Sequence, residues 1–215
     1  MITLIDYKAG NLTSVRKAFT HLGQESVVTD DPRQVRDAQA LVLPGVGHFV
    51  TCERLASSGV RAAVLEAIAR GVPFLGICVG MQWQFAGSTE APETQGLALF
   101  EGSCERFQTT LNQTTLKVPH VGWNQICRTA EGEHSRLLRG VPSESFVYFT
   151  HSYRAPVVEG VSAVTTYGET FAAAVERDNV FGVQFHPEKS GDTGLRILQN
   201  FCDVAAEYAA ERNAQ

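Results

Sequence analysis

The sequence lacks the features that mark several classes of protein. Its 18 Lys and Arg are outnumbered by 23 Asp and Glu, and it has no basic run, so nucleic-acid binding is not expected. No apolar stretch approaches the roughly 18 residues that a helix needs to cross a bilayer. Residues 2–6 read as a buried strand rather than as the apolar core of a signal peptide, so we expect a cytoplasmic protein.

Cysteine is present, but not in pairs. The scattered, odd-numbered set is Cys52, Cys78, Cys104, Cys127 and Cys202, without any CxxC pair. This pattern argues against both a disulfide framework and a structural zinc site. We expect most of these residues to be reduced and buried as small hydrophobic groups, which leaves room for one catalytic cysteine.

The first half of the chain alternates between strands and helices. Apolar runs predict strands at residues 2–6, 25–29, 40–43 and 73–77. Apolar residues recur at helical spacing over 12–22 and 60–68, and the second of these helices is expected to stop at Gly71. Repeated strand-then-helix units indicate a parallel sheet with helices on both faces.

The pattern changes after about residue 96, where Thr, Val, Tyr and Phe become frequent in short segments. These predict strands at 102–107, 115–118, 146–149, 162–167, 172–175 and 180–185. Turn residues between them indicate mixed or antiparallel pairing, and a helix is expected over 192–208. The predicted fold is α/β, an open and mostly parallel sheet flanked by helices with additional antiparallel strands in the second half. Residues 1–215 are expected to form a single domain.

Cys78 stands where a strand is expected to turn sharply into a helix, with Gly76 and Gly80 two positions to either side. A nucleophile at such an elbow is exposed above the sheet, and the small neighbours allow the strained backbone. The N-terminus of the following helix favours both a thiolate and an oxyanion. We therefore interpret Cys78 as a nucleophile, against the alternative of one more buried small residue.

A cysteine that attacks an amide needs a base, and the base needs an orienting partner. His186 ends the apolar strand 180–185 and has Glu188 two residues on, which points to the same side in extended backbone. Pro187 favours that extended geometry at His186. The alternative is a surface histidine beside an incidental glutamate. Three other histidines in Gly- or Pro-marked segments are expected at most to line a site, namely His48, His120 and His151.

The run 44–47 follows the third predicted strand, so it should lie at the same sheet edge as Cys78. A dinucleotide fingerprint is disfavoured because Val50 stands where the third glycine belongs. A backbone that presents N–H groups to an oxyanion suits the cysteine chemistry better. A plain tight turn is the remaining alternative.

These segments together resemble the class I, triad-type glutamine amidotransferase family, whose fold is flavodoxin-like. The resemblance rests on residues 44–47, 76–82 and 185–188, in the family's order. Segments 5–11, 117–124, 148–153 and 184–190 narrow it to the glutaminase subunits of histidine biosynthesis. It covers roughly residues 2 to 202 of the chain.

The resemblance implies roles for individual residues. The catalytic triad would be Cys78, His186 and Glu188, and the oxyanion hole the backbone N–H groups of Val46 and Val79. Glutamine would be bound by Gly45, Gly47, Gln82, Glu90, Ser152 and Tyr153. The partner subunit would be faced by Asn11, His120, Trp123, Tyr148 and Lys189. The family usually has leucine where Val79 stands, a change that should be tolerated because only the backbone N–H is used. No metal or organic cofactor is implied.

The implied reaction is hydrolysis of L-glutamine to L-glutamate and ammonia. No acceptor-binding domain remains once the triad fold is accounted for, so the ammonia should be used by another polypeptide. The resemblance implies a heterodimer with a (β/α)8-barrel cyclase subunit, and turnover that rises when this partner is present. The alternatives are a stand-alone glutaminase for pyridoxal phosphate synthesis, a cysteine peptidase or stress-type hydrolase, and a catalytically silent regulatory module.

Overall fold

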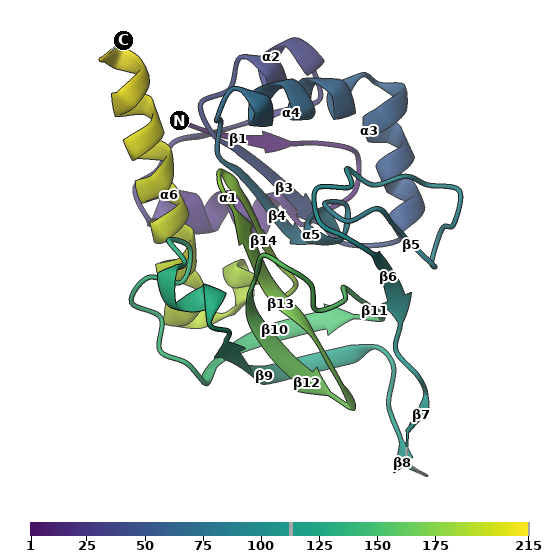
Figure 1. The fold of residues 1–215 in the computed structure, drawn as a ribbon. Helices are drawn as coiled ribbons and strands as arrows, with labels where there is room; N and C mark the ends of the chain where they lie inside the picture. The colour runs from purple at the N-terminus through teal and green to yellow at the C-terminus, as the bar shows by residue number, and fades with distance from the viewer. Residues whose placement is uncertain (112–113, 215) are drawn as a thin grey trace.

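The computed structural model describes residues 1–111 and 114–214, which are built around a twisted sheet of nine strands (Figure 1). The order across this sheet is β10-β9-β12-β13-β14-β4-β3-β1-β2. Its parallel part contains β1 (Ile2–Ile5), β2 (Ser26–Thr29), β3 (Leu41–Gly45), β4 (Phe74–Cys78) and β14 (Val180–Val183). All but β2 are buried along their whole length, as expected for parallel strands covered on both faces.

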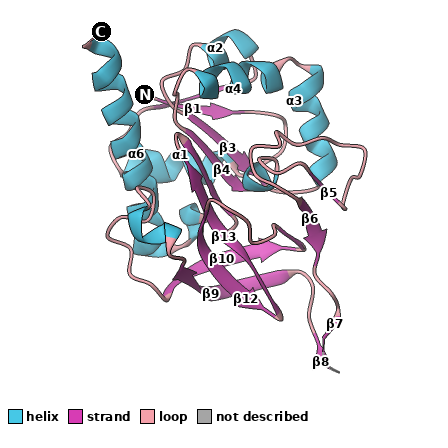
Figure 2. Ribbon diagram, viewed as in Figure 1, coloured by secondary structure: helices cyan, strands magenta, loops and turns pink. Residues whose placement is uncertain are grey.

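Two groups of helices cover the parallel strands (Figures 1 and 2). On one side lie α2 (Pro32–Arg36), α3 (Glu53–Ser57) and α4 (Val60–Ala69), and on the other α1 (Leu12–His21) and α6 (Gly191–Asn213). Shorter helical segments are α5 (Val79–Gln82), η1 (Phe49–Cys52), η2 (Glu131–His134) and η3 (Pro187–Lys189). Gly71 follows α4 with a φ of +86°, as its predicted role of helix stop requires. In the described part of the chain, no helix combines the length and apolarity needed to cross a membrane.

The second half of the chain adds antiparallel strands to β14. They are β9 (His120–Arg128), β10 (Ser145–His151), β12 (Val161–Tyr167) and β13 (Glu169–Arg177). A small side sheet consists of β5 (Gly87–Ser88), β6 (Ser103–Arg106) and β11 (Tyr153–Arg154). The antiparallel pair β7 (Thr110–Leu111) and β8 (Thr114–Thr115) extends beyond it (Figure 2). This mixed sheet with flanking helices confirms the predicted α/β fold.

One predicted strand is largely wrong, and one long strand was not predicted. Of the segment 115–118, only its first residue belongs to a strand, β8. The Lys117 carbonyl accepts the Tyr167 hydroxyl at 2.7 Å instead of a ladder bond, and Pro119 has no N–H to extend one. The unpredicted strand is β9, the central partner of both β10 and β12.

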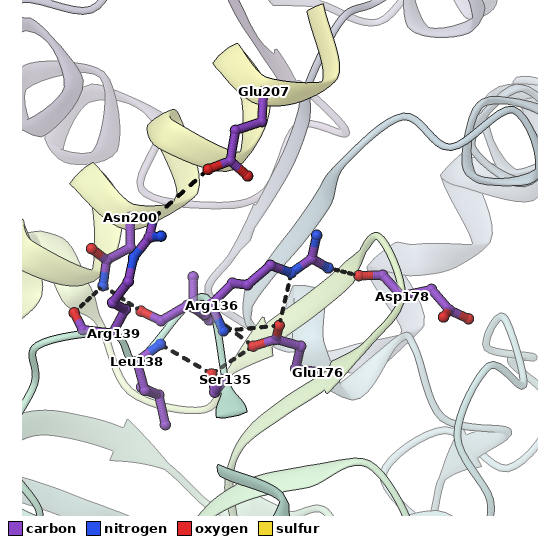
Figure 3. A network of polar contacts seen from close by, with 9 residues as sticks. Ser135, Arg136, Leu138, Arg139, Glu176, Asp178, Asn200 and Glu207 are labelled. Atoms are coloured by element: carbon purple, nitrogen blue, oxygen red, sulfur yellow. Dashed lines mark hydrogen bonds and ion pairs between the residues drawn. The ribbon is translucent and has the colours of Figure 1, made fainter. Parts of the chain in front are cut away.

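A polar network ties the segment after η2 to β13 and α6 (Figure 3). The Ser135 hydroxyl donates to the Glu176 carboxylate at 2.5 Å, and the backbone N–H of Arg136 donates to the same carboxylate at 3.1 Å. On α6, the Asn200 amide donates to the carbonyls of Leu137 and Arg139, both at 2.8 Å. Since α6 begins directly after residues 186–190, this network also anchors the helix behind His186.

Candidate active site

Cys78 occupies a strained turn between β4 and α5. Its φ is 53° and its ψ is −109°, a conformation that non-glycine residues adopt only where the surroundings enforce it. The surroundings are tight: a Cβ added at Gly76 would lie 2.4 Å from the Gly80 carbonyl oxygen, and one added at Gly80 would lie 2.0 Å from the Leu43 oxygen. Only glycine fits at both positions, so the elbow predicted from the sequence is present.

His186 and Glu188 form a buried pair on the neighbouring strand end. Nδ1 of His186 lies 2.9 Å from Oε1 of Glu188, and the two side chains are 1% and 0% exposed. The backbone of this segment is held by Ser190, whose hydroxyl donates to the His186 carbonyl at 2.7 Å and accepts from the Tyr148 N–H at 2.9 Å. The carboxylate thereby fixes a proton on Nδ1 of His186 and leaves Nε2 to exchange one.

The electrostatics favour a charged imidazole. Burial alone would lower the pKa of His186, but its interaction with Cys78 and its hydrogen bond to Glu188 raise that pKa to about 10. Nε2 of His186 is buried and has no hydrogen-bond partner of ordinary geometry among the described residues. A base with this environment can hold the proton of a thiol and return it to a leaving group.

A cavity of about 260 Å³ opens over Cys78. Eight of its lining residues were predicted to belong to the site: Val46, Gly47, Cys78, Val79, Gln82, Glu90, Ser152 and Tyr153. Two others, Pro119 and Thr150, were not, and the last is His151, one of the histidines expected at most to line a site. Gly45 is not among the lining residues but is paired with Cys78 between β3 and β4, and an added Cβ there would lie 2.7 Å from the Gly80 nitrogen. The volume is below the roughly 300–1,000 Å³ of drug-sized pockets, so it suits a small molecule.

The model of the family described as glutamine amidotransferase class-I matches residues 3–205. The chain belongs to the class-I glutamine amidotransferases. It is 46% identical over 209 residues to the imidazole glycerol phosphate synthase subunit HisH of Syntrophotalea carbinolica, covering 95% of this chain and 100% of the relative. The same subunit of Methanothermobacter thermautotrophicus is 45% identical over 205 residues, with 95% and 98% covered. Among solved structures, the Trypanosoma brucei CTPS glutaminase domain with bound acivicin superposes with a TM-score of 0.67 at 17% identity, over 96% and 93% of the two chains.

Two polar side chains of this amidotransferase face the cavity with defined chemistry. The Gln82 amide nitrogen lies 2.8 Å from the Tyr153 carbonyl and 3.0 Å from Gln184 Oε1, so both its protons are used and only its oxygen remains for a ligand. Glu90 accepts the Phe49 backbone N–H at 2.7 Å, which fixes the carboxylate at the cavity wall. An acceptor oxygen and a carboxylate suit an ammonium group.

Two histidines lie in the core of the amidotransferase beside the cavity. The His151 ring is 2.8 Å from the Tyr153 carbonyl, an acceptor, so Nδ1 carries the proton and Nε2 accepts from His120 at 3.3 Å. Burial lowers the pKa of His151 to about 3 and that of His120 to about 4. Both are therefore neutral at pH 7, unlike His186, whose pKa is raised.

The residues expected to face a partner are only partly brought together. Trp123 and Tyr148 are paired across β9 and β10, with ring centroids 6.1 Å apart, and the Lys189 ammonium lies 5.7 Å from the Tyr148 ring. The Asn11 amide is 3.4 Å from Glu188 Oε1. His120, by contrast, is 3% exposed and stacks on Tyr167 in the core, on the opposite face of β9 from Trp123.

Two further residues at the site were not assigned a role from the sequence, Ser190 and Gln184. The Gln184 amide nitrogen lies 3.5 Å from Cys78 Sγ. Its position two residues before His186, in the predicted strand 180–185, could have indicated that the two side chains point to the same side. Among the described residues, no group of three or more His, Cys, Asp or Glu side chains is arranged to hold a metal ion.

Proposed function

We propose that this chain hydrolyses the side-chain amide of L-glutamine, as the glutaminase subunit of an imidazole glycerol phosphate synthase. The observation that carries this function is Cys78 on its strained elbow, next to the buried His186–Glu188 pair and open to a cavity of about 260 Å³. The curated relatives at 46% and 45% identity support the assignment to histidine biosynthesis. We take residues 1–215 as one amidotransferase domain. A cytoplasmic location is supported by the cysteines, all of which are free.

The first half of the reaction forms a thioester. His186 holds the proton of Cys78, and the thiolate attacks the amide carbon of glutamine. The C–N bond then breaks as His186 gives its proton to the leaving nitrogen, which departs as ammonia. Glu188 keeps the imidazole in the orientation that lets Nε2 serve both transfers.

The second half regenerates the cysteine. His186 takes a proton from water, the resulting hydroxide attacks the thioester carbon, and the C–S bond breaks to release glutamate and the thiolate. The backbone N–H groups of Val79, at the start of α5, and of Val46 stabilise the oxyanion of both tetrahedral states. Removing one such donor typically costs about 10²–10³ in rate.

The ammonia passes to a (β/α)8-barrel cyclase subunit, which makes imidazole glycerol phosphate and aminoimidazole carboxamide ribotide. Support for a partner surface comes from the outer face of β9 and β10, where Val121, Trp123 and Phe146 are 55%, 55% and 54% exposed. Large apolar side chains gathered on one face of a sheet mark an interaction site. Two other residues expected at the interface contact this region: Lys189 lies over the ring of Tyr148 on β10, and the Asn11 amide contacts the Glu188 carboxylate.

The test is glutamate release from glutamine, measured on the chain alone and with the cyclase and its nucleotide ligand. We expect low turnover alone and a marked increase in the complex. Cys78→Ala should lower turnover by at least about 10³-fold, whereas Cys202→Ala, another buried free cysteine, should leave it unchanged. Glutaminase activity that survives in Cys78→Ala would refute the proposed chemistry. A lone chain as fast as the complex would refute its dependence on the partner.

A further inference from the structure

A second glutamine, Gln184, lies against the sulfur of Cys78. It directly follows β14, is 0% exposed, and its backbone N–H donates to the Ala173 carbonyl at 2.9 Å. Its side-chain nitrogen Nε2 is 3.5 Å from Cys78 Sγ, a hydrogen-bond distance for a sulfur acceptor. The backbone around this amide is therefore fixed, and the amide is aimed at the nucleophile.

Hydrogen bonds to neighbouring groups decide which end of the Gln184 amide, its oxygen or its NH₂ group, faces Cys78. The Tyr153 carbonyl can only accept, so the Gln82 side chain must turn its NH₂ group toward it, at 2.8 Å. The second proton of that NH₂ group goes to Gln184 Oε1 at 3.0 Å. With its oxygen held by Gln82, Gln184 has only its NH₂ group left for the sulfur. The Tyr153 carbonyl on β11 thus orients the Gln82 amide, and the Gln82 amide orients that of Gln184, so that Cys78 Sγ faces an N–H donor.

We propose that Gln184 is a positioning residue that holds Cys78 Sγ in its attacking orientation and stabilises the thiolate, with Gln82 setting the polarity of the contact. This role rests on Cys78 being the nucleophile of the proposed function. An N–H group bonds a charged sulfur more strongly than a neutral thiol, so the contact gains strength when the thiol proton moves to His186. It is lost again when sulfur is bonded to carbon in the thioester, which favours the return of the thiolate in the second half-reaction.

Substitution of Gln184 by methionine tests this role, because Met keeps the length of the side chain and removes the donor. The rate of alkylation by iodoacetamide is followed against pH on the Cys78 peptide, since Cys127 is exposed and reacts too. We expect alkylation of Cys78 near pH 7 to fall about tenfold and its profile to move to higher pH, as for loss of a hydrogen bond to a charged group. The kcat of glutamine hydrolysis should fall with it while KM changes little, because Gln184 contacts the sulfur and does not line the cavity.

Gln84→Met is the matched control. Gln84 is equally buried, and its amide donates to the Phe181 carbonyl at 2.7 Å. Its loss should lower stability in a similar way and leave the Cys78 profile unchanged. Gln184→Glu is a second probe that keeps the bond from Gln82 but faces the sulfur with an acceptor, so it should slow alkylation more than Gln184→Met.

The outcomes separate this role from the function it rests on. A wild-type alkylation profile in either Gln184 variant would overturn the role of Gln184, even if Cys78→Ala abolishes glutaminase activity. An equal shift in Gln84→Met would overturn it as well, because the effect would then be one of general destabilisation. Activity that persists in Cys78→Ala would instead refute the proposed function, whatever the alkylation profiles show.

Discussion

The substitution Gly80→Ala should have two opposite effects on the stability of the fold. Gly80 lies within α5, where alanine is favoured over glycine by about 1 kcal/mol. The added Cβ, however, would sit 2.0 Å from the Leu43 carbonyl oxygen, and both groups belong to the backbone. Overpacking of this kind costs roughly 1–3 kcal/mol, and no flexible side chain is present to yield. We take the upper end and expect a net destabilisation of about 2 kcal/mol, which lowers Tm by roughly 4–8 °C in a chain of this size.

The same clash should disturb catalysis more than stability. To relieve it, α5 and β3 must separate by about 1 Å, and a shift of that size at the reacting atoms costs about 10²-fold in rate. Thermal unfolding and glutamate release from the complex with the cyclase measure the two effects. Gly87→Ala is the control, because its added Cβ would make only an ordinary contact with Thr94 at 3.5 Å. Wild-type Tm and turnover in Gly80→Ala would refute the reasoning that the elbow admits only glycine.

Three other perturbations have defined outcomes. Glu188→Gln should lower the pKa of His186 and reduce kcat by up to about 10⁴-fold with little change in KM, measured by steady-state glutaminase kinetics. Burial lowers the pKa of His151 from 6.5 to about 3 and that of His120 to about 4, so the unfolded chain binds more protons as pH falls below 6.5, and each of the two histidines should cost about 2 kcal/mol of stability by pH 5. The raised pKa of His186 acts in the opposite direction, but only between pH 7.5 and 6.5, since below pH 6.5 this residue is protonated in both states. His120 and His186 contribute equally to the wild type and to His151→Gln, so urea unfolding at pH 7.5 and 5 should show a loss smaller by about 2 kcal/mol in this variant, and an equal loss would contradict the assignment. Asn200→Ala leaves two carbonyls without their donor and should cost about 1–3 kcal/mol in urea unfolding, against little change for the partly exposed Gln199→Ala.

The parallel half of the fold was predictable because each of its strands can be recognised from its own residues. Buried parallel strands are continuous apolar runs, and the runs at 2–6, 40–43 and 73–77 coincide within two residues with β1, β3 and β4. β9 has no such signal: its inward positions include His120, Gly122 and Asn124, so no apolar alternation exists. Its strand conformation depends on pairing with β10 and β12, segments that are distant in sequence.

The same distinction separates the site residues that were predicted from those that were not. Cys78, His186 and Glu188 are set by local features, an elbow between two glycines and a strand end followed by Pro187. The contact of Gln184 with Cys78 joins residues 106 apart, and its bond to Gln82 joins residues 102 apart. No local pattern encodes the direction of a buried amide whose partners lie so far along the chain.

The position of β14 has a consequence for synthesis of the protein. β14 is among the last strands in the sequence, yet it lies in the interior of the sheet between β4 and β13 (Figure 1). His186 and Glu188 follow it within five residues, so Cys78 meets its proposed base only after this strand has entered the sheet beside β4. A growing chain therefore carries Cys78, the proposed nucleophile, through more than 100 further residues before it can be used. Fragments that end before β14 should consume no glutamine, which restricts the activity to chains that have completed the sheet.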